Sequence, residues 1–267
     1  MRSRCATDSI FTRVEDGLFE PTEHAAGPWD PRALHGGAPA ALIARAFERA
    51  QPGAELPIAR LRFEFLKPIP FARLRLQTEI VRDGRRVQEL AAELRAGDEL
   101  ICRAGAVRVQ PVPAGLPSGG PQPARSMPGP EHGQVRRFAL NRDADRSLAT
   151  TGMEMSWLGD SSSPGPGQVW MRLRRAILPG EQTGPLVRLV ATADFGNGVS
   201  AELPFDEYLF INADLAIHLW RRPHGEWIGL DARTFLYEGG TGTAESVLHD
   251  TSGPVGRAFQ TLVVQPR

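Results

Sequence analysis

Apolar and polar positions follow two distinct periodicities along the chain, one helical and one alternating. In the first half, residues 38–50 (APAALIARAFERA) place apolar side chains at helical spacing, directly after Gly36 and Gly37. The residues that follow alternate between apolar and polar positions, which is the pattern of half-buried strands. We therefore expect one helix and then an antiparallel meander, with a short strand over residues 9–21 before the helix. The expected strands of the meander span 58–66, 74–83, 86–96 and 99–109.

The second half repeats this series of strands. Its alternating segments lie at a constant offset of 154 residues from those of the first half, so that Leu61, for example, matches Leu215. A fixed offset over four strands with matching turns indicates an internal duplication of one α+β unit, whereas the alternative is two unrelated β-rich halves. Two preceding segments, 168–175 and 186–195, are also apolar or alternating. The expected strands of the second series span 210–223, 226–238, 242–250 and 254–264.

A stretch rich in Pro, Gly and Ser separates the two series. Residues 111–131 (PVPAGLPSGGPQPARSMPGPE) show no periodic pattern and are expected to form an exposed linker. This linker divides the chain into an N-terminal unit, 1–110, and a C-terminal unit, 132–267. In each unit the helix can bury one face against the sheet, and edge strands can join the two units into one continuous sheet. The expected fold class is therefore α+β, in the form of a double hotdog.

Composition excludes several classes of protein. The chain has 31 basic residues, 31 acidic residues and 41% hydrophobic residues, without a basic or acidic block, which is typical of a globular protein that does not bind nucleic acid. No apolar run approaches the length of a membrane-spanning helix, and residues 1–20 lack the apolar segment of a signal peptide. Cys5 and Cys102 are too few for a disulfide framework. We therefore expect a cytoplasmic protein that does not bind membranes.

Several familiar catalytic and cofactor motifs are absent from the sequence. It contains no G-x-S-x-G, no phosphate-binding loop, no H-E-x-x-H and no C-x-x-C, and its six histidines include no i, i+4 pair. Neither a metal nor a cofactor is expected. Residues 196–201 (GNGVSA) match a dinucleotide-binding pattern, but Pro204 interrupts the long helix that such a motif requires. We interpret this as a chance match.

Three features of the sequence are candidates for chemistry. Gly36 and Gly37 lie at a helix start, where backbone amides can polarise the oxygen of a ligand, although a tight turn or cap is the alternative. Asp194 lies at an expected helix start, where the macrodipole stabilises a carboxylate, and a capping role is the alternative. Gln260 lies within an apolar strand where its repeat mate is Ala106, so it either pairs with a buried group or faces solvent.

Several segments together carry a resemblance to a known family. Over nearly its full length the chain resembles the acyl-CoA thioesterase II type of the hotdog superfamily. The resemblance implies a double-hotdog subunit that hydrolyses acyl-CoA thioesters to free acid and coenzyme A in lipid metabolism, without a cofactor, and that forms homo-oligomers. The segments that carry it are residues 17–48 (GLFEPTEHAAGPWDPRALHGGAPAALIARAFE), 60–70 (RLRFEFLKPIP), 81–88 (VRDGRRVQ), 210–236 (FINADLAIHLWRRPHGEWIGLDARTFL) and 242–267 (GTAESVLHDTSGPVGRAFQTLVVQPR).

The resemblance also implies a catalytic set of an Asp, a Thr or Ser, and a Gln. These positions correspond to Asp194, Asn212 and Gln260, so an Asn stands where the family has a hydroxyl residue. The repeat mates of the two amide residues are the apolar Ile58 and Ala106, and we therefore expect one active site per chain, on the second half. The hypothesis is that the three side chains converge on one water, with Asp194 as its base or orienting group.

Candidate substrate-binding residues lie in the first half. They are His35, Gly36 and Gly37, whose amides would either face the thioester carbonyl across the interface between the units or cap their own helix. An apolar groove between the units would hold the acyl chain. Arg221 and Arg222 are candidates for contacting the phosphates of coenzyme A, with a solvated loop as the simpler interpretation.

Two other functions are compatible with the sequence. A non-catalytic acyl-CoA binding or sensing protein would explain why Asn212 replaces a hydroxyl residue. A hotdog enoyl-CoA hydratase or dehydratase pairs a His with an acid across the interface. His35 is suitably placed for such a role, but no acid motif of that type accompanies it in the sequence.

Overall fold

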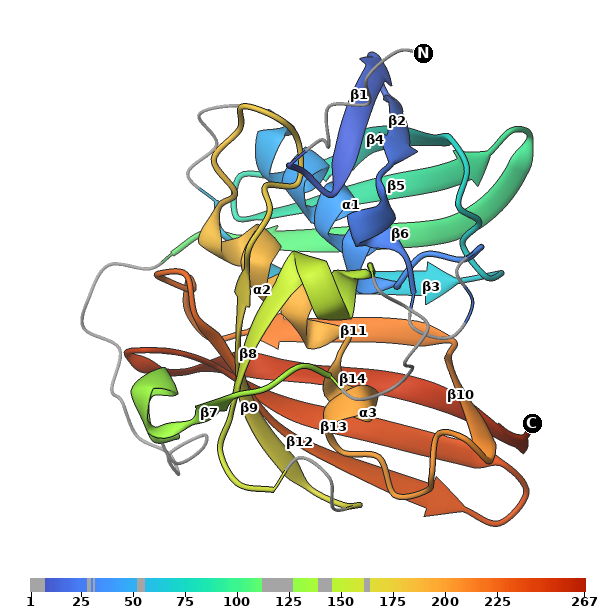
Figure 1. The fold of residues 1–267 in the computed structure, drawn as a ribbon. Helices are drawn as coiled ribbons and strands as arrows, with labels where there is room; N and C mark the ends of the chain where they lie inside the picture. Colours follow the sequence, from blue (N-terminus) through green and yellow to red (C-terminus); the bar gives the residue numbers. More distant parts are fainter. Residues whose placement is uncertain are drawn as a thin grey trace.

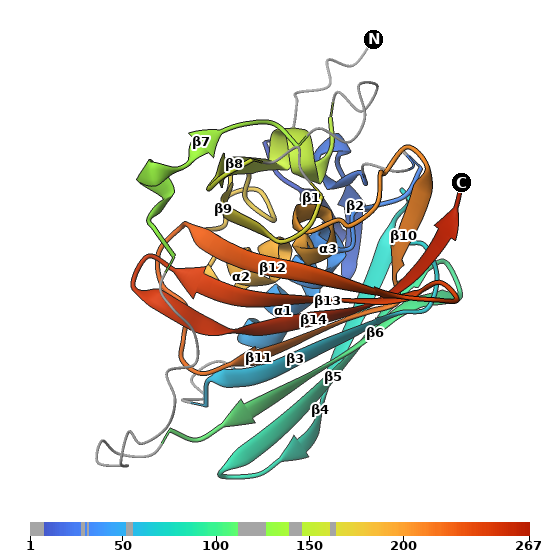
Figure 2. The ribbon, with the colours of Figure 1, turned by 90° about the horizontal axis from the view of Figure 1, so that it is seen from below.

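The computed structural model describes residues 8–27, 30, 32–51, 56–111, 127–138, 146–160 and 164–267. These residues form one 14-stranded sheet, with all paired strands antiparallel, that curves around the helices (Figure 1, Figure 2). The helices are α1 (Gly37–Arg49), α2 (Pro185–Ala193) and α3 (Gly196–Val199), with the short turns η1 (Glu23–Ala25), η2 (Pro130–His132) and η3 (Leu148–Gly152).

The strands fall into two groups that follow the two halves of the sequence. Those of the first half are β1 (Phe11–Glu15), β2 (Leu18–Pro21), β3 (Ile58–Phe65), β4 (Leu74–Asp83), β5 (Val87–Ala96) and β6 (Glu99–Val109). Those of the second half are β7 (Gln134–Val135), β8 (Met153–Trp157), β9 (Gly167–Leu173), β10 (Tyr208–Asn212), β11 (Asp214–Leu219), β12 (Ile228–Tyr237), β13 (Thr241–Asp250) and β14 (Gly253–Pro266).

The sheet is symmetric about its centre. Its strand order is β1-β2-β4-β5-β6-β3-β11-β14-β13-β12-β9-β8-β7, so four strands of one half meet four equivalent strands of the other at the β3–β11 pair. β4, β5 and β6 begin at residues 74, 87 and 99, and β12, β13 and β14 begin at residues 228, 241 and 253, a constant separation of 154 residues. In the central pair Arg62 lies opposite Ala216, which is its own repeat mate. The duplication therefore produces a pseudo-twofold arrangement.

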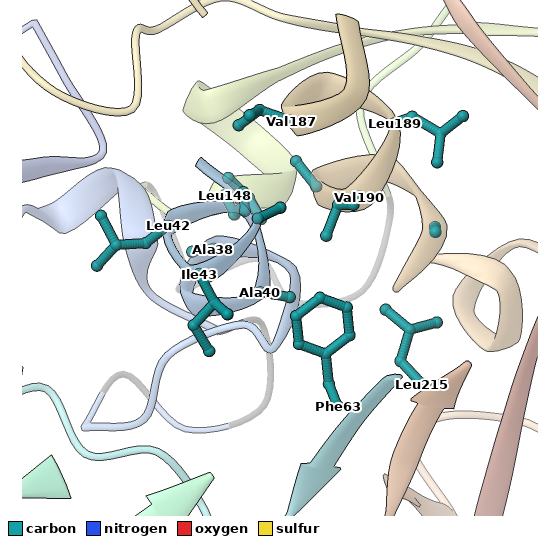
Figure 3. Close-up of a cluster of buried hydrophobic side chains, with 14 of the residues drawn as sticks. Ala38, Ala40, Leu42, Ile43, Phe63, Leu148, Val187, Leu189, Val190 and Leu215 are labelled. Atoms are coloured by element: carbon teal, nitrogen blue, oxygen red, sulfur yellow. The ribbon is translucent and has the colours of Figure 1, made fainter. Parts of the chain in front are cut away.

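α1 and α2 pack against each other inside the curve of the sheet (Figure 2). α1 is buried on almost all sides, and its alanines allow neighbouring elements to approach closely. Figure 3 shows Phe63 of β3 and Leu215 of β11 pointing towards the helices, in one cluster with Ala40 and Val190. Each fully buried Leu or Phe of this layer contributes about 1.5–3 kcal/mol to stability. Both halves therefore contribute side chains to the main hydrophobic core.

The expected helix and the long strands are confirmed to within a few residues, with two exceptions. Residues 9–21 form a hairpin of β1 and β2 rather than one strand, because Gly17 adopts a positive φ of 70° in the turn between them. Residues 210–223 are divided between β10 and β11 at Ala213. Residues 186–195, which share the apolar pattern of the strands, fall mostly in α2, because a short apolar run does not by itself distinguish a helix from a buried strand.

The boundaries between the units are described only in part. Residues 112–126 of the expected linker lie outside the described residues, as does Cys5. The division into units 1–110 and 132–267 stays a prediction. Among the described residues, no helix combines the length and the apolar character needed to cross a membrane.

A buried histidine in the second half makes stability depend on pH. His249 of β13 is fully buried, and neither of its ring nitrogens has a hydrogen-bond partner within the described part of the chain. Burial lowers the pKa of His249 below the ordinary value of 6.5, because the charged imidazolium loses its hydration, and Asp231 and Asp250 offset only part of this effect. The folded protein thus favours the neutral ring.

Acid should therefore destabilise the fold through His249. The unfolded chain takes up a proton on this residue at about pH 6.5, whereas the folded chain does so only at lower pH, so the free energy of unfolding falls as the pH drops below 6.5. Urea unfolding at pH 7.5 and pH 5.5 should show a smaller loss of stability for His249→Leu than for the wild type. His132→Leu, at an exposed histidine, should keep the wild-type pH dependence. An equal acid loss in His249→Leu would contradict this assignment.

Candidate active site

The carboxylate of Asp194 is buried where the two halves meet. Its side chain is 3% exposed. The residue directly follows α2 and is the C-terminal cap of that helix. The expectation that Asp194 opens a helix is wrong: the four-residue α3 begins two residues later, and the end of α2 carries the unfavourable pole of a helix dipole. The helix start that faces the carboxylate belongs to α1, because a Cβ built on its N-cap residue Gly36 would lie 2.8 Å from Asp194 Oδ2.

Two amide side chains hold this carboxylate. Asn212 Nδ2 donates to Asp194 Oδ1 at 2.9 Å. Gln260 Nε2 donates to the same Oδ1 at 3.2 Å and to the backbone carbonyl of Asp194 at 3.1 Å. Hydrogen bonds to an ionised carboxylate are stronger than those between neutral groups, and they offset part of the cost of burying the charge. The structure thus brings together the three residues that the sequence suggested as a catalytic set.

Strand geometry explains why both amides point inwards. Gln260 on β14 is 2% exposed and its neighbour Phe259 is 36% exposed, so Gln260 faces the helices and the solvent-facing alternative is wrong. Asn212 ends β10 next to a shift in strand register. It pairs with Leu262 of β14, whereas Ala216 of β11 pairs with Phe259. A bulge of this kind re-aims the side chains beside it, here towards Asp194.

His35 reaches Asp194 from the first half. Its Nδ1 lies 3.0 Å from Asp194 Oδ2 and 3.1 Å from the amide nitrogen of Gly37. A protonated Nδ1 donates to the carboxylate, whereas an unprotonated Nδ1 accepts from Gly37; the carboxylate is the stronger partner because its hydrogen bond is charge-assisted. The imidazole also stacks on Phe195, with 4.1 Å between the ring centroids. The sequence showed no acid motif beside His35, and the structure corrects this by placing Asp194 there.

Gly36 and Gly37 permit the close contact between the two halves. A Cβ on Gly37 would lie 2.6 Å from the carbonyl oxygen of Ala191 in α2, which is closer than side chains approach a backbone oxygen. Gly36 lines the cavity beside Asp194, whereas Gly37 does not. The Gly36 amide has no acceptor among the residues that the structure describes. Of the two glycine amides, that of Gly36 is therefore the one available to a ligand.

A cavity of about 520 Å³ adjoins this polar group. Its walls come from both halves of the chain. The polar groups that line it include His35, Asp194, Asn197 and Asn212. A volume of this size is typical of a small-molecule site with a few polar groups in an apolar wall. The apolar part of the wall includes Leu34, Phe65, Leu66, Ile69, Phe138, Phe195, Leu209, Phe210 and Ile211.

Two amide oxygens at the cavity have unused hydrogen-bonding capacity. Asn212 Oδ1 and Asn197 Oδ1 are buried and have no partner in the described part of the chain. Asn197 is a residue that the sequence analysis missed, because its surroundings were interpreted as a chance nucleotide motif. The signal that could have revealed it is a polar residue between two glycines in an otherwise apolar segment. Its backbone N–H donates to Gln260 Oε1 at 3.0 Å, which ties it to the residue that also holds Asp194.

The opposite end of the helix pair has a different arrangement. There Arg45 donates to both carboxylate oxygens of Glu181, at 2.6 and 2.7 Å. The hydrogen bonds from Arg45 lower the pKa of Glu181, so this carboxylate is a poor base. The repeat mates of the two site amides are Ile58 and Ala106, which cannot hold a carboxylate. Within the described residues, the polar set around Asp194 thus has no equivalent at this end.

The remaining sequence candidates lie away from the cavity. Arg221 donates to both carboxylate oxygens of the buried Asp250, at 2.5 and 2.7 Å, and so is engaged in an internal ion pair. Lys67 is the basic residue that lines the cavity. In the described ranges, no group of three or more His, Cys, Asp or Glu side chains is placed to hold a metal ion.

The sequence profiles of two known protein domains match most of the chain. Residues 25–109 match the sequence profile of the acyl-CoA thioesterase N-terminal domain, and residues 117–264 match that of the acyl-CoA thioesterase C-terminal domain. The chain belongs to the acyl-CoA thioesterase family. Among curated proteins, none matches this thioesterase-family chain significantly.

Solved structures show the fold of this thioesterase-family chain. A hot dog fold protein of unknown function from Alicyclobacillus acidocaldarius has a TM-score of 0.70 at 15% identity, covering 98% of this chain and 97% of its own. A candidate thioesterase from Novosphingobium aromaticivorans has a TM-score of 0.70 at 19% identity, covering 95% and 98%. The acyl-CoA thioesterase II TesB2 from Mycobacterium marinum has a TM-score of 0.65 at 15% identity, covering 96% and 95%. The expected α+β double hotdog is confirmed.

Adding a methyl group at Gly37 should disrupt the contact that positions Asp194. The new Cβ of Gly37→Ala would meet the backbone of Ala191, which cannot move without shifting α2, and overpacking of this kind costs about 1–3 kcal/mol. Gly184→Ala is the matched control at the N-cap of α2, because its Cβ would meet the flexible carboxylate of Glu48 at 3.3 Å. Urea unfolding should show a clear loss for Gly37→Ala and little change for Gly184→Ala. Equal effects of the two substitutions would argue against a special close approach at Gly37.

Proposed function

We propose that this protein hydrolyses acyl-CoA thioesters to a free acid and coenzyme A. The observation that carries the proposal is the buried carboxylate of Asp194, held by donors from both halves at the edge of an apolar cavity. Membership of the acyl-CoA thioesterase family supports acyl-CoA as the substrate class. A cavity with mostly apolar walls fits an acyl chain next to a small group of polar atoms.

Hydrogen-bond capacity defines a place for the attacking water. A carboxylate has about four acceptor positions, and Asn212, Gln260 and His35 use three of those on Asp194, which leaves one on Oδ2. Asn212 Oδ1 is a second free acceptor, because its amide nitrogen must face the carboxylate. A water can donate one hydrogen to Asp194 Oδ2 and the other to Asn212 Oδ1. In this arrangement Asn212 orients the water without a hydroxyl group.

Gln260 then acts differently from the hypothesis based on the sequence. Its amide nitrogen donates to Asp194, and its oxygen accepts from the backbone of Asn197, so both ends of the side chain are occupied. We therefore propose Gln260 as a positioning residue for the carboxylate. Asp194 and Asn212 would be the residues that contact the water.

The chemical step uses these groups in order. Asp194 takes a proton from the water as the water oxygen adds to the thioester carbonyl carbon. The carbonyl oxygen becomes an oxyanion near the free amide of Gly36, at the start of α1. When the oxyanion re-forms the carbonyl, the C–S bond breaks and the proton on Asp194 passes to the leaving sulfur. The products are a carboxylic acid and the thiol of coenzyme A.

The same proposal includes a homo-oligomer of the chain in the cytoplasm. Exposed apolar side chains lie on the outer face of the second-half sheet, which supports pairing of subunits through that face. They include Phe235, Tyr237, Phe259 and Val263.

Hydration of an enoyl-CoA is a second candidate function, and one observation favours it. The contact between His35 and Asp194 joins a histidine and an acid across the two halves, as such an enzyme requires. Three further contacts favour hydrolysis instead, because both amides and the helix start of α1 converge on the same carboxylate.

Two assays separate these reactions, and replacement of Asp194 tests its role as the base. Asp194→Ala and Asp194→Asn remove the base, and we expect thioester hydrolysis to fall by about 10²- to 10⁴-fold while the protein stays folded. Thiol release from a panel of acyl-CoAs of different chain lengths measures hydrolysis, and loss of conjugated absorbance measures hydration of an enoyl-CoA. Asp98→Ala, in an exposed turn, is the surface control and should keep the wild-type rate. Unchanged turnover in both Asp194 variants would show that another group is the base.

Substitutions at Asn212 should test the orienting role and the non-catalytic alternative. Asn212→Leu removes the hydrogen bond to a charged group and should lower the rate of hydrolysis about 10- to 100-fold. Asn212→Thr keeps a group that donates to Asp194 and accepts from water, and it should stay within about tenfold of the wild type. Tight acyl-CoA binding without turnover in the wild type and in Asn212→Thr would instead support a binding or sensing protein.

A further inference from the structure

The proposed hydrolysis leaves one requirement of the site unmet. A thioester oxygen that gains negative charge is commonly stabilised by more than one N–H donor, arranged in advance in a place shielded from water. The start of α1 offers two amides, but Gly36 lines the cavity and Gly37 does not. This leaves Gly36 as the backbone donor at the helix start. A second donor must come from another element that lines the cavity.

Asn197 has the properties of that second donor. The residue lines the cavity, is 5% exposed and belongs to α3, which follows Asp194. Its Oδ1 is buried without a partner. Among the described residues, the Asn197 hydrogen bond goes from the backbone N–H, and the side-chain Nδ2 donates to none of their acceptors. Leaving a buried amide group unpaired costs about 1–3 kcal/mol. The unpaired Oδ1 would take a water as its donor, and Nδ2 is the end of the side chain that can donate to the oxygen of a ligand.

The placement of Asn197 is coupled to that of the base. Gln260 accepts from the Asn197 backbone N–H at 3.0 Å through Oε1 and donates to Asp194 Oδ1 at 3.2 Å through Nε2. One rigid amide therefore fixes the carboxylate and the backbone of Asn197 relative to each other. This connection places Asn197 beside the reacting centre rather than at a distant part of the acyl groove.

We propose that the side-chain amide of Asn197 donates a hydrogen bond to the carbonyl oxygen of the thioester and stabilises the oxyanion together with Gly36 N–H. The inference rests on the proposed function and adds a catalytic residue to it. Water adds to the carbonyl carbon, the carbonyl π electrons move to the oxygen, and Asn197 Nδ2–H and Gly36 N–H bind the resulting negative charge. The charge returns to the C–O bond when the sulfur leaves. Asn197 itself gains and loses no proton.

Removing the amide should affect rate rather than stability. Asn197→Leu replaces an unpaired buried polar group with an apolar one, so its melting temperature should equal or exceed that of the wild type. The kcat for the acyl-CoA that the wild type hydrolyses best should fall about 10²- to 10³-fold, with KM changed far less. Asn197→Ala is a second variant that removes the amide without a branched side chain. Gln182→Leu makes a similar change at an exposed amide outside the cavity and should keep the wild-type kcat.

Two unreactive analogues show whether the amide contacts the carbonyl oxygen. One is a ketone in which a methylene replaces the sulfur of the acyl-CoA, and the other is an S-alkyl-CoA thioether that lacks the carbonyl. The wild type should bind the ketone more tightly, and Asn197→Leu should weaken ketone binding by about tenfold while leaving thioether binding unchanged. A purely structural role would weaken both analogues alike.

The outcomes distinguish this inference from the proposed function. Normal kcat in both Asn197 variants, or equal weakening of ketone and thioether, would overturn the role of Asn197 while hydrolysis by the wild type still stands. If the wild type hydrolyses no acyl-CoA, the proposed function fails, and selective loss of ketone binding in Asn197→Leu still decides whether Asn197 contacts a carbonyl oxygen.

Discussion

The burial of one carboxylate governs the architecture around the site. A charge as inaccessible as that of Asp194 is tolerated in a protein only when donors surround it. Here the donors are Asn212, Gln260 and His35, which come from two strands and from the loop before α1. Each must be held within hydrogen-bond distance, so the bulge beside β10, the inward face of β14 and the glycine contact between α1 and α2 are all required at once. The same constraint that stabilises the charge also orients it towards the cavity.

The two halves are related by pseudo-twofold symmetry, but the polar side chains at the two ends of the helix pair differ. Both halves contribute the same four long strands at the same separation, and the central pair relates Arg62 to Ala216 across the axis. The helices depart from this symmetry, because α1 has 13 residues whereas α2 ends after nine, at Asp194. One end of the helix pair thus carries the polar set around Asp194 and the cavity beside it, and the other end carries the ion pair of Arg45 and Glu181. Within the described residues, the duplicated scaffold therefore carries one polar set of this kind.

The sequence was most informative where a local pattern decides the structure. Alternation located the long strands and the 154-residue offset located their partners, because one face of each strand is buried and the other is exposed. It failed at α2, because a short apolar run does not by itself distinguish a helix from a buried strand, and so Asp194 was assigned to the wrong end of a helix. The contact between His35 and Asp194 joins residues 159 positions apart, and no local signal reports it. Asn197 was overlooked because its significance lies in a missing partner, which only three-dimensional surroundings reveal.

The union of the halves through β3 and β11 has a consequence for how the protein matures. These neighbouring strands are far apart in the chain, and β14, which supplies Gln260, is synthesised after all the other described strands. Folding that depends on such non-local pairing is slow, because a long loop must close, at a cost in entropy, before the stabilising contacts can form. The first half can collapse during synthesis, but the pocket beside Asp194 takes shape only when the C-terminal strand docks. A nascent or truncated chain would therefore hold the helix start of α1 without the carboxylate it is built to face.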